Sequence, residues 1–388
     1  MTGRHAGVKL PRNIEHARLD TAESQVENVA RHRPAESDVF PTSAVIIPSF
    51  NSAKFIDIAL ASLQYQTRRP DEVIVVDAGS TDRTEEIVRG FAHLLNIQFL
   101  LAPKTTQGQA RNVGIRAARS DLVCFLDSDD IFLSRHIESA GRLLGAEPEI
   151  DAVRGYQVQW NSTADTLELN YDFHRAIDNE VEIFEISINL STLTIRRNLL
   201  MSRGILFADN LRGRYCEDWD FCVRLLASGI RMNNIEEPVS VVTERSGSHT
   251  RKSIFWKMRF LLLRTMVENQ PSVAARRGTD IHAVARIAAG VDSQRFKAAV
   301  TMLAAGRPRM ARRLSRRLQT PKYRLVAGLA VAAARVLPGA SALFTWLGTR
   351  MGGYGRWRLR TPGTLPGEPA LLDLRRRWLD EPPQHSGR

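Results

Sequence analysis

The chain has 388 residues, of which 43% are hydrophobic, so it is long enough for two or three domains with a sizeable core. Its three cysteines, Cys124, Cys216 and Cys222, include no CxxC pair, which argues against a zinc site and a disulfide framework and favours a reducing compartment. The formal net charge is +12, but the basic residues are concentrated at one end of the chain.

Residues 1–41 are polar and of mixed charge, and they show no sustained apolar period. They contain no apolar stretch of the kind that a secretory signal requires. The sequence therefore predicts a mobile N-terminal extension, and we expect the protein to work in the cytoplasm.

Strands and helices alternate along the chain from Ser43. Short apolar runs bounded by polar residues predict four strands, at residues 44–47, 73–77, 97–101 and 122–126, the first and the last of them buried. Pro48 is expected to end the first of them. Helices are predicted between the strands, and this alternation indicates right-handed βαβ units in an α/β fold with a mostly parallel central sheet.

Polar clusters follow three of the predicted strands at their carboxyl ends. They are Pro48–Asn51, Asp77 and Asp127–Asp130. Ligands of open α/β sheets bind beyond the carboxyl ends of the strands. The pattern therefore predicts a nucleotide-type site at this edge of the sheet.

Residues 151–242 are less regular. Strands are predicted at residues 152–153, 156–160 and 193–195. A helix is predicted over Cys216–Ala227, with Gly229 closing it as a C-terminal cap.

Residues 251–388 form a basic, mainly helical region with 27 basic and 7 acidic residues, against 27 and 35 in the first 250 residues. Leu325–Leu347 is apolar, but Arg335 and Pro338 interrupt it, which favours an interfacial or packed helical hairpin over a membrane span. The excess of basic residues in 251–388 suggests an anionic partner, either a membrane surface or nucleic acid. A solvated arginine-rich face remains an alternative.

Asp127 and Asp129 lie one residue apart where a buried strand ends. Two such carboxylates, together with substrate phosphates, are typical ligands of Mg²⁺ or Mn²⁺, and the cation would neutralise a departing nucleoside diphosphate. The spacing alone is a weak signal, because acidic turns that cap a helix are common.

Two further groups of residues are candidates for catalysis or for phosphate binding. Glu217 and Asp218 open a helix, where the helix dipole favours acidic residues, but a positioned carboxylate there can also be a general base. Arg111 and Asn112 lie in the first turns of a predicted helix over residues 109–118, where a phosphate could bind; an ion pair at the surface is the alternative for Arg111.

In this order the motifs resemble family 2 glycosyltransferases, and the resemblance covers residues 44–242. It is carried by VIIPSFNSAKFIDIALASLQYQTRRPDEVIVVDAGSTDRTEEIV, GQARNVGIRAARSDLVCFLDSDD and CEDWDFCVRLLASG. The resemblance implies a glycosyltransferase A-type fold, a nucleotide-diphosphate sugar donor, Mg²⁺ or Mn²⁺, and inversion at the anomeric carbon.

The resemblance also implies roles on the donor side. Pro48 and Phe50 match the loop that binds the base, and Asp77 matches the carboxylate that accepts from a uracil-like ring. Arg111 and Asn112 match the segment near the phosphates.

At the reacting end, Asp127 matches the residue near the ribose, with a share in the metal, and Asp129 matches the metal ligand. Asp218 matches the catalytic base, with Glu217 beside it on the acceptor side. His249 is a weaker candidate for a further metal ligand.

The sequence therefore predicts a catalytic domain at residues 42–250 and a basic helical region at 251–388. The expected activity is transfer of a sugar to a hydroxyl of a glycan or a lipid-linked acceptor, with peripheral contact to the inner face of the plasma membrane.

Two alternatives remain, a nucleotidyltransferase on a similar sheet and a non-catalytic protein whose basic tail binds nucleic acid. The first lacks a phosphate loop rich in Gly, Arg and Lys, and the second has few aromatic residues in its tail for base stacking.

Overall fold

The computed structural model describes residues 40–161, 166–170, 179–184, 188–210, 216–244, 255–336 and 356–358. The described residues from Pro41 onward belong to one compact unit. The predicted N-terminal extension up to residue 39, His249 and the end of the apolar stretch, from Leu337 to Leu347, lie outside the described residues.

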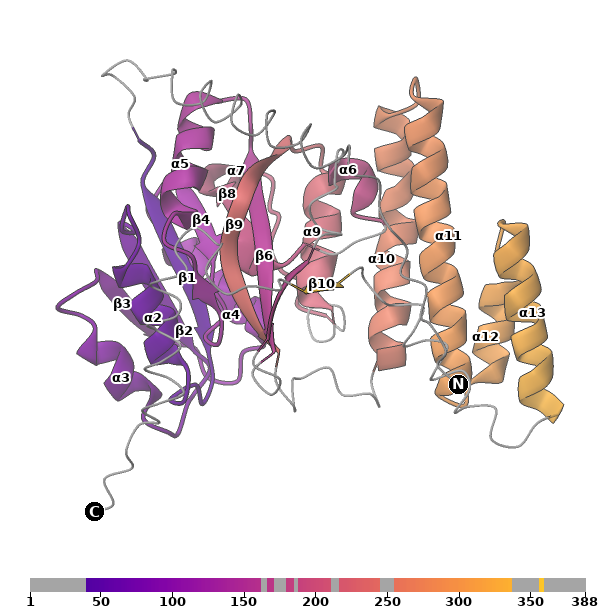
Figure 1. The fold of residues 1–388 in the computed structure, drawn as a ribbon, viewed down its shortest axis with the longest axis horizontal. Coiled ribbons are helices and arrows are strands. Elements are labelled where there is room, and N and C mark those ends of the chain that lie inside the picture. Colours follow the sequence, from indigo (N-terminus) through magenta and orange to yellow (C-terminus); the bar gives the residue numbers. More distant parts are fainter. Residues whose placement is uncertain are drawn as a thin grey trace, which may run out of the picture. The chain divides into compact units, whose positions relative to one another are not determined.

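Four parallel strands form one half of the sheet, in the order β4-β1-β2-β3 (Figure 1). They are β1 (Ser43–Ser49), β2 (Glu72–Asp77), β3 (Ile97–Leu101) and β4 (Leu122–Phe125). The helices in their connections are α2 (Ile56–Gln64), α3 (Thr84–Gly90) and α4 (Gln107–Ala117). The predicted strands and the α/β class are confirmed.

Both faces of β1, β2 and β4 are buried, which explains the continuous apolar runs of these three strands, whereas the edge strand β3 is half-buried to exposed. Ile46 and Ile74 belong to the core cluster that includes α4, whereas Val45 and Val73 belong to the cluster that includes α2. Adjacent residues of one strand therefore contribute to two different cores, as the alternation of side chains along a strand requires.

The prediction that Pro48 ends the first strand is wrong. β1 continues through Pro48, which lies opposite Val76 of β2. Pairing of β1 with β4 has already stopped at Ile46, so the missing amide hydrogen of the proline removes no ladder hydrogen bond on that side.

Further strands extend the sheet beyond β4, mostly by antiparallel pairing. They are β5 (Ile131–Phe132), β6 (Ala152–Asn161), β7 (Thr166–Asn170), β8 (Leu193–Arg196), β9 (Met232–Glu244) and β10 (Arg356–Arg358). The helices of this part are α5 (His136–Ala146), α6 (Asn179–Glu182), η3 (Leu190–Thr192), α7 (Arg197–Ser202) and α9 (Glu217–Ala227). The sequence analysis missed β9, because its first half, Met232–Pro238, is polar and lacks an apolar alternation.

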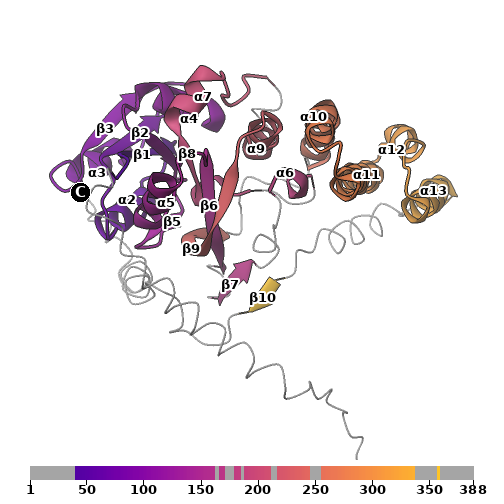
Figure 2. The ribbon, with the colours of Figure 1, turned by 90° about the horizontal axis from the view of Figure 1, so that it is seen from above.

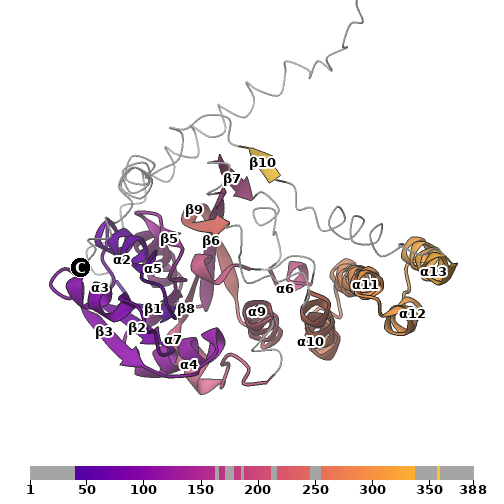
Figure 3. The ribbon, with the colours of Figure 1, turned by 90° about the horizontal axis from the view of Figure 1, so that it is seen from below.

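The C-terminal region is helical, as predicted. It comprises α10 (Phe255–Arg276), α11 (Ile281–Ala304), α12 (Pro308–Ser315) and α13 (Pro321–Val336). Figure 2 and Figure 3 show these helices one after another beside α9, and each contacts the helix before it. Within the described part of the chain, no helix combines the length and the apolar character needed to cross a bilayer.

The C-terminal helices share a core with the sheet. Leu262 and Met266 of α10 and Ile287 of α11 are buried in the same cluster as Phe125 of β4. Removal of the helices would expose this apolar surface to water, so the region is part of the folded body of the chain.

Candidate functional site

The three polar loops at the carboxyl ends of β1, β2 and β4 are joined by hydrogen bonds. The Asn51 amide donates to Ser80 Oγ at 2.7 Å, and Asn51 Oδ1 accepts from the Thr81 amide at 2.9 Å. The hydroxyls of Ser52 and Ser128 lie 2.9 Å apart, which links the β1 loop to the loop after β4. The predicted convergence of these loops at one edge of the sheet is therefore present.

Asp77 organises the loop that follows β2. Its side chain is only 2% exposed, and one carboxylate oxygen accepts from the amides of Gly79 and Ser80 at 2.9 and 2.7 Å. The other oxygen accepts from Ser80 Oγ at 2.5 Å. Gly79 has a φ of 98°, in the region that favours glycine, and this turn shapes the loop. Phe50, next to this loop, is 61% exposed.

Arg111 lies below the loops, on α4, and is 2% exposed. Its Nη2 donates to Asp127 Oδ1 at 2.5 Å, and its guanidinium lies 5.4 Å from the centre of the Phe207 ring. Its Nε and Nη1 have no hydrogen-bond partner among the described residues. The alternative of an ion pair at the surface is therefore wrong, because this ion pair is internal.

A close approach between α4 and α9 brings Arg111 to the acidic residues of α9. A methyl group added to Gly108 would lie 3.0 Å from Phe207 Cβ and 3.4 Å from Glu217 Cβ, so a larger residue would require these side chains to shift. Thr106 and Gln109 cap α4 reciprocally, at 2.8 and 3.2 Å, and so define where the helix begins.

Glu217 and Asp218 start α9 and face Asp127 and Arg111 across about 90 residues of sequence. Burial, followed by the charge of Asp218, raises the pKa of Glu217 to about 7, although Arg111 opposes the shift. The pKa of Asp218 is also raised, because the protein around the carboxylate desolvates it, although the residue is exposed to solvent. Two neighbouring carboxylates with raised pKa values are typical of a catalytic acid–base site.

The same cluster determines the ionisation of Arg111. Burial alone would lower the pKa of the guanidinium, but the charges of Asp127, Glu217 and Asp218 raise it above its ordinary value. One buried cation thus faces three carboxylates, and the site keeps an excess of negative charge. Such an excess suits a divalent cation or a proton.

Asn112 contributes to this arrangement from the inside of the fold. Its Nδ2 donates to the Phe207 carbonyl at 2.9 Å, and its Oδ1 accepts from the Phe207 amide at 2.8 Å. Phe207 also stacks on Phe221 of α9, with ring centres 4.2 Å apart. Asn112 therefore holds Phe207, whose ring lies against the Arg111 guanidinium, through both ends of its amide. The expected phosphate contact of Asn112 stays a prediction.

The carboxylates of the acidic turn after β4 have different surroundings, so one of them stabilises the turn and two are the candidate ligands of a metal. Asp130 is 4% exposed and accepts from Ser191 Oγ at 2.7 Å, so it stabilises the turn. Asp127 and Asp129 are half-buried, and one oxygen of Asp127 is used by Arg111. In the described segments, no group of three or more His, Cys, Asp or Glu side chains is arranged to bind a metal. Two carboxylates completed by substrate phosphates fit Mg²⁺ or Mn²⁺, which bind proteins in that way.

The sequence analysis missed Gln107 and Phe207 as parts of this site. With its amide turned to suit both neighbours, Gln107 accepts from Arg111 at 3.1 Å and donates to Glu217 at 3.3 Å. A glutamine one residue before Gly108 gives no signal by itself, and Phe207 lies in a segment without a motif. Only the packing of α4 against α9 reveals either residue.

We predict that Glu217→Gln stabilises the fold at high pH and not at low pH. The pKa of Glu217 is higher in the folded chain than the ordinary value of 4.5, so the native state binds more protons than the unfolded state between pH 4.5 and about 7. Stability of the native chain is therefore lost as pH rises through this window, by on the order of 1 kcal/mol, and glutamine avoids the loss. Thermal unfolding from pH 4.5 to 8 measures the effect.

The control for this prediction is Glu149→Gln, since Glu149 is exposed. An equal melting temperature of Glu217→Gln and the native chain at pH 8 would contradict the predicted burial cost.

Comparisons with known proteins identify the family of the chain. The family model described as "Glycosyl transferase family 2" matches residues 44–206. The PGL/p-HBAD biosynthesis glycosyltransferase of Mycobacterium bovis is 30% identical over 191 residues, which are 48% of this chain and 71% of the relative. The poly(ribitol-phosphate) beta-N-acetylglucosaminyltransferase TarS of Staphylococcus aureus is 26% identical over 212 residues, which are 53% of this chain and 36% of the relative.

Among solved structures, residues 1–349 of S. aureus TarS with UDP-GlcNAc match with a TM-score of 0.49 and 19% identity, over 76% of this chain and 91% of that one. The mycobacterial relative is matched over more than two thirds of its own length at 30% identity. The chain therefore belongs to glycosyl transferase family 2, and it is a glycosyltransferase.

Proposed function

We propose that this glycosyltransferase moves a sugar from a nucleotide-diphosphate sugar to a hydroxyl of a cell-envelope glycan or a lipid-linked acceptor, with inversion at the anomeric carbon. The observation that carries the proposal is the cluster in which Arg111 and Asp127 face Glu217 and Asp218. The names of the relatives, which include a poly(ribitol-phosphate) transferase and a PGL/p-HBAD biosynthesis enzyme, support an envelope acceptor.

Asp218 is the general base in this proposal. Its carboxylate takes the proton of the acceptor hydroxyl while the hydroxyl oxygen forms a bond to the anomeric carbon. The bond from that carbon to the diphosphate oxygen breaks on the opposite side, so the sugar is transferred with inversion. The raised pKa of Asp218 makes it a stronger base than an ordinary aspartate.

Glu217 lies beside the base on the acceptor side. With a pKa of about 7 it is partly protonated near neutral pH, and so it can donate a hydrogen bond to an acceptor oxygen as well as accept one. Asp129, with Asp127, would bind Mg²⁺ or Mn²⁺, which would neutralise charge on the departing diphosphate. Arg111 forms an ion pair with Asp127 and so holds that carboxylate in place.

The β1 and β2 loops are proposed to bind the nucleoside part of the donor. The exposed ring of Phe50 and the backbone of Pro48 border this loop pair, and Asp77 maintains its shape through the Gly79–Ser80 turn. Asp77 would therefore act on nucleotide binding by fixing the loop, with or without a direct contact to the base.

A screen of nucleotide sugars tests the activity. The full-length protein is incubated with Mn²⁺ and UDP-, GDP- and dTDP-linked sugars, and release of the nucleoside diphosphate is measured with and without acceptor glycans. We expect slow hydrolysis of one donor in water and faster turnover when a suitable hydroxyl acceptor is added. Absence of turnover with every donor and acceptor would overturn the proposed function.

An exposed apolar stripe on α13 supports membrane contact. Leu325, Val326 and Leu329 are 65%, 40% and 63% exposed, and their spacing places them on one face of the helix. The other face, with Ala327 and Val331, packs into the cores shared with α11 and α12. One face of α13 is therefore packed in the core, and the opposite face exposes two leucines to solvent.

Basic residues accompany this stripe. Exposed arginines on α12 and just after it are Arg309, Arg312, Arg313, Arg316 and Arg317. Basic residues near anionic lipid contribute about 1 kcal/mol each, and buried apolar side chains add to that. We propose that α12 and α13 bind the chain peripherally to an anionic membrane surface, where a lipid-linked acceptor would be found.

Binding to vesicles is the expected result of this arrangement. The full-length protein should sediment with phosphatidylglycerol–phosphatidylcholine vesicles at low salt and be released in part at high salt, because salt screens the arginines. Replacing Leu325 and Leu329 by glutamine should weaken sedimentation several-fold. The matched change Ile281→Gln removes an apolar side chain that is 73% exposed on α11 and should have no effect. A native protein that ignores these vesicles at low salt would refute the membrane contact.

A further inference from the structure

Helix α10 of the basic region binds the first turn of α9, which carries Glu217 and Asp218. Thr265 of α10 is fully buried, and its Oγ1 donates to Asp220 Oδ1 at 2.7 Å. Asp220 is also fully buried, and its other oxygen accepts from Arg224 Nε at 2.8 Å. A buried carboxylate is costly unless it is hydrogen-bonded, so this pair of donors restrains where the turn can lie.

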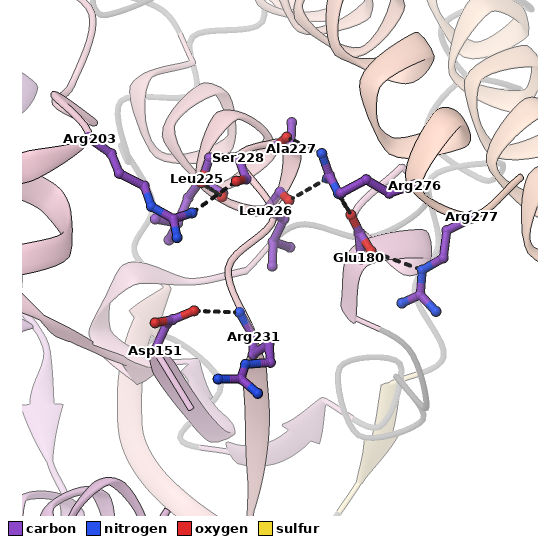
Figure 4. Close-up of polar contacts among 10 residues, drawn as sticks. All are labelled: Asp151, Glu180, Arg203, Leu225, Leu226, Ala227, Ser228, Arg231, Arg276 and Arg277. Atoms are coloured by element: carbon purple, nitrogen blue, oxygen red, sulfur yellow. Dashed lines mark hydrogen bonds and ion pairs between the residues drawn. The ribbon is translucent and has the colours of Figure 1, made fainter. Parts of the chain in front are cut away.

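The same helix binds the last turn of α9 (Figure 4). Arg276 donates from Nη1 to the Ala227 carbonyl at 2.8 Å and from Nη2 to the Leu226 carbonyl at 3.1 Å. Glu180 of α6 orients this arginine by accepting from its Nε at 2.8 Å, and it accepts from Arg277 Nε at 2.9 Å. A cation that satisfies the final carbonyls of a helix also complements the helix dipole.

Between the first and the last turn of α9, apolar packing and a cation–π contact join α9 to α10. Leu262 and Met266 of α10 belong to the same buried cluster as Phe221 of α9. The Arg259 guanidinium lies 6.0 Å from the ring centre of Trp219, the residue after Asp218. Contacts at both ends and along the length leave α9 little freedom to slide or rotate.

The side of α9 that α10 contacts determines where the catalytic carboxylate points. Asp218 and Asp220 are two residues apart, which is a rotation of about 200° around a helix of 3.6 residues per turn. When Asp220 is fixed toward Thr265, Asp218 must therefore lie on the opposite side. That side is where Arg111 and Asp127 influence the pKa of Asp218.

We infer that α10 positions the catalytic turn of α9, and that Thr265 is a positioning residue that acts on Asp218 through Asp220. The inference rests on the proposed function, because it takes Asp218 as the base. It gives the start of the basic region a task in catalysis that is separate from membrane contact by α12 and α13. The sequence showed no motif in this region.

The test compares Thr265→Val, which keeps the shape but removes the hydroxyl, with Thr265→Ser, which keeps the donor. The matched control is Thr301→Val on α11, where the hydroxyl donates within its own helix, to the Lys297 carbonyl at 2.7 Å. The first readout is turnover of the donor that the screen selects. Because small misplacements of catalytic groups cost up to about 10²-fold in rate, we expect kcat of Thr265→Val to fall at least tenfold with an unchanged KM for the donor.

Two further readouts separate positioning from general destabilisation. Thr265→Val should move the acidic limb of the kcat–pH profile, since the surroundings of Asp218 change, and Thr265→Ser should restore both kcat and the profile. Hydrogen exchange of the amides at residues 217–222 should become faster in Thr265→Val and stay unchanged in Thr301→Val.

Each outcome decides between the proposals. Equal kcat, pH profile and exchange in Thr265→Val and Thr301→Val would overturn the inference. A loss of kcat that serine does not restore would also overturn it, since the hydroxyl would then be irrelevant. A native protein that turns over no donor refutes the proposed function instead, and the exchange measurement still decides whether Thr265 holds the first turn of α9.

Discussion

Replacement of Asp129 by alanine is expected to abolish sugar transfer while the fold survives. Asp129 is half-buried in the turn after β4, beside the ion pair of Asp127 and Arg111, and it is the proposed ligand of Mg²⁺ or Mn²⁺. Neutralisation of a leaving diphosphate by a metal contributes several kcal/mol to the transition state, so kcat should fall by at least about 10³-fold. Turnover in Mn²⁺ with the native chain and the variant measures the loss.

Removal of the metal should have the same effect as removal of the ligand. We expect EDTA to stop turnover of the native chain and an excess of Mn²⁺ to restore it, whereas the variant should respond to neither. Calorimetry with Mn²⁺ and UDP or GDP should show weaker metal binding in the variant. Full activity in EDTA would refute a metal-assisted reaction.

The neighbouring acid provides the matched control for Asp129. Asp130→Asn removes the same charge one residue away, but asparagine can still accept the hydrogen bond from Ser191 Oγ. Its activity should therefore stay within a few-fold of the native value. A loss as large as that of Asp129→Ala would indicate that the acidic turn acts through its total charge.

Asp218→Asn is expected to lower kcat by at least about 10²-fold, which is the range that removal of a general base costs. Asparagine keeps the size of the side chain and its hydrogen bond from the Trp219 amide, at 2.7 Å in the native chain, but it cannot accept a proton. Affinity for the nucleotide sugar should change little, because the base acts on the acceptor. Single-turnover kinetics with saturating donor, together with calorimetry of donor binding, separate the two effects.

Asp209→Asn serves as the control for Asp218, since Asp209 is exposed on the loop before α9. In the native chain, kcat should also decrease as pH falls through the raised pKa of Asp218, because a protonated carboxyl cannot act as a base. Normal kcat with weak donor binding in Asp218→Asn would assign Asp218 to the donor side instead.

The parallel half of the sheet could be predicted from local sequence. The apolar runs of β1, β2 and β4 are short, continuous and bounded by polar residues, a pattern that is typical of strands buried on both faces. The polar ends of these strands also indicated where the site lies, since topology alone brings them together.

The rest of the sheet was harder to predict. The parallel pairing of β6 with β9 shifts register around Tyr156, and β9 begins with the polar stretch Met232–Pro238. Such strands are held by their partners, so their own sequence carries little of the information.

The sequence by itself determined the chemistry of the site: its carboxylates, its arginine and the edge of the sheet at which they meet. Only the tertiary structure decided how these groups divide their tasks. It places Arg111 in the interior on Asp127, assigns Asp130 to the turn and Asn112 to Phe207, and attaches α9 to α10 through Thr265. The physical reason is that burial, ionisation and hydrogen-bond partners depend on residues between 16 and 95 positions away in the sequence, which no local pattern records.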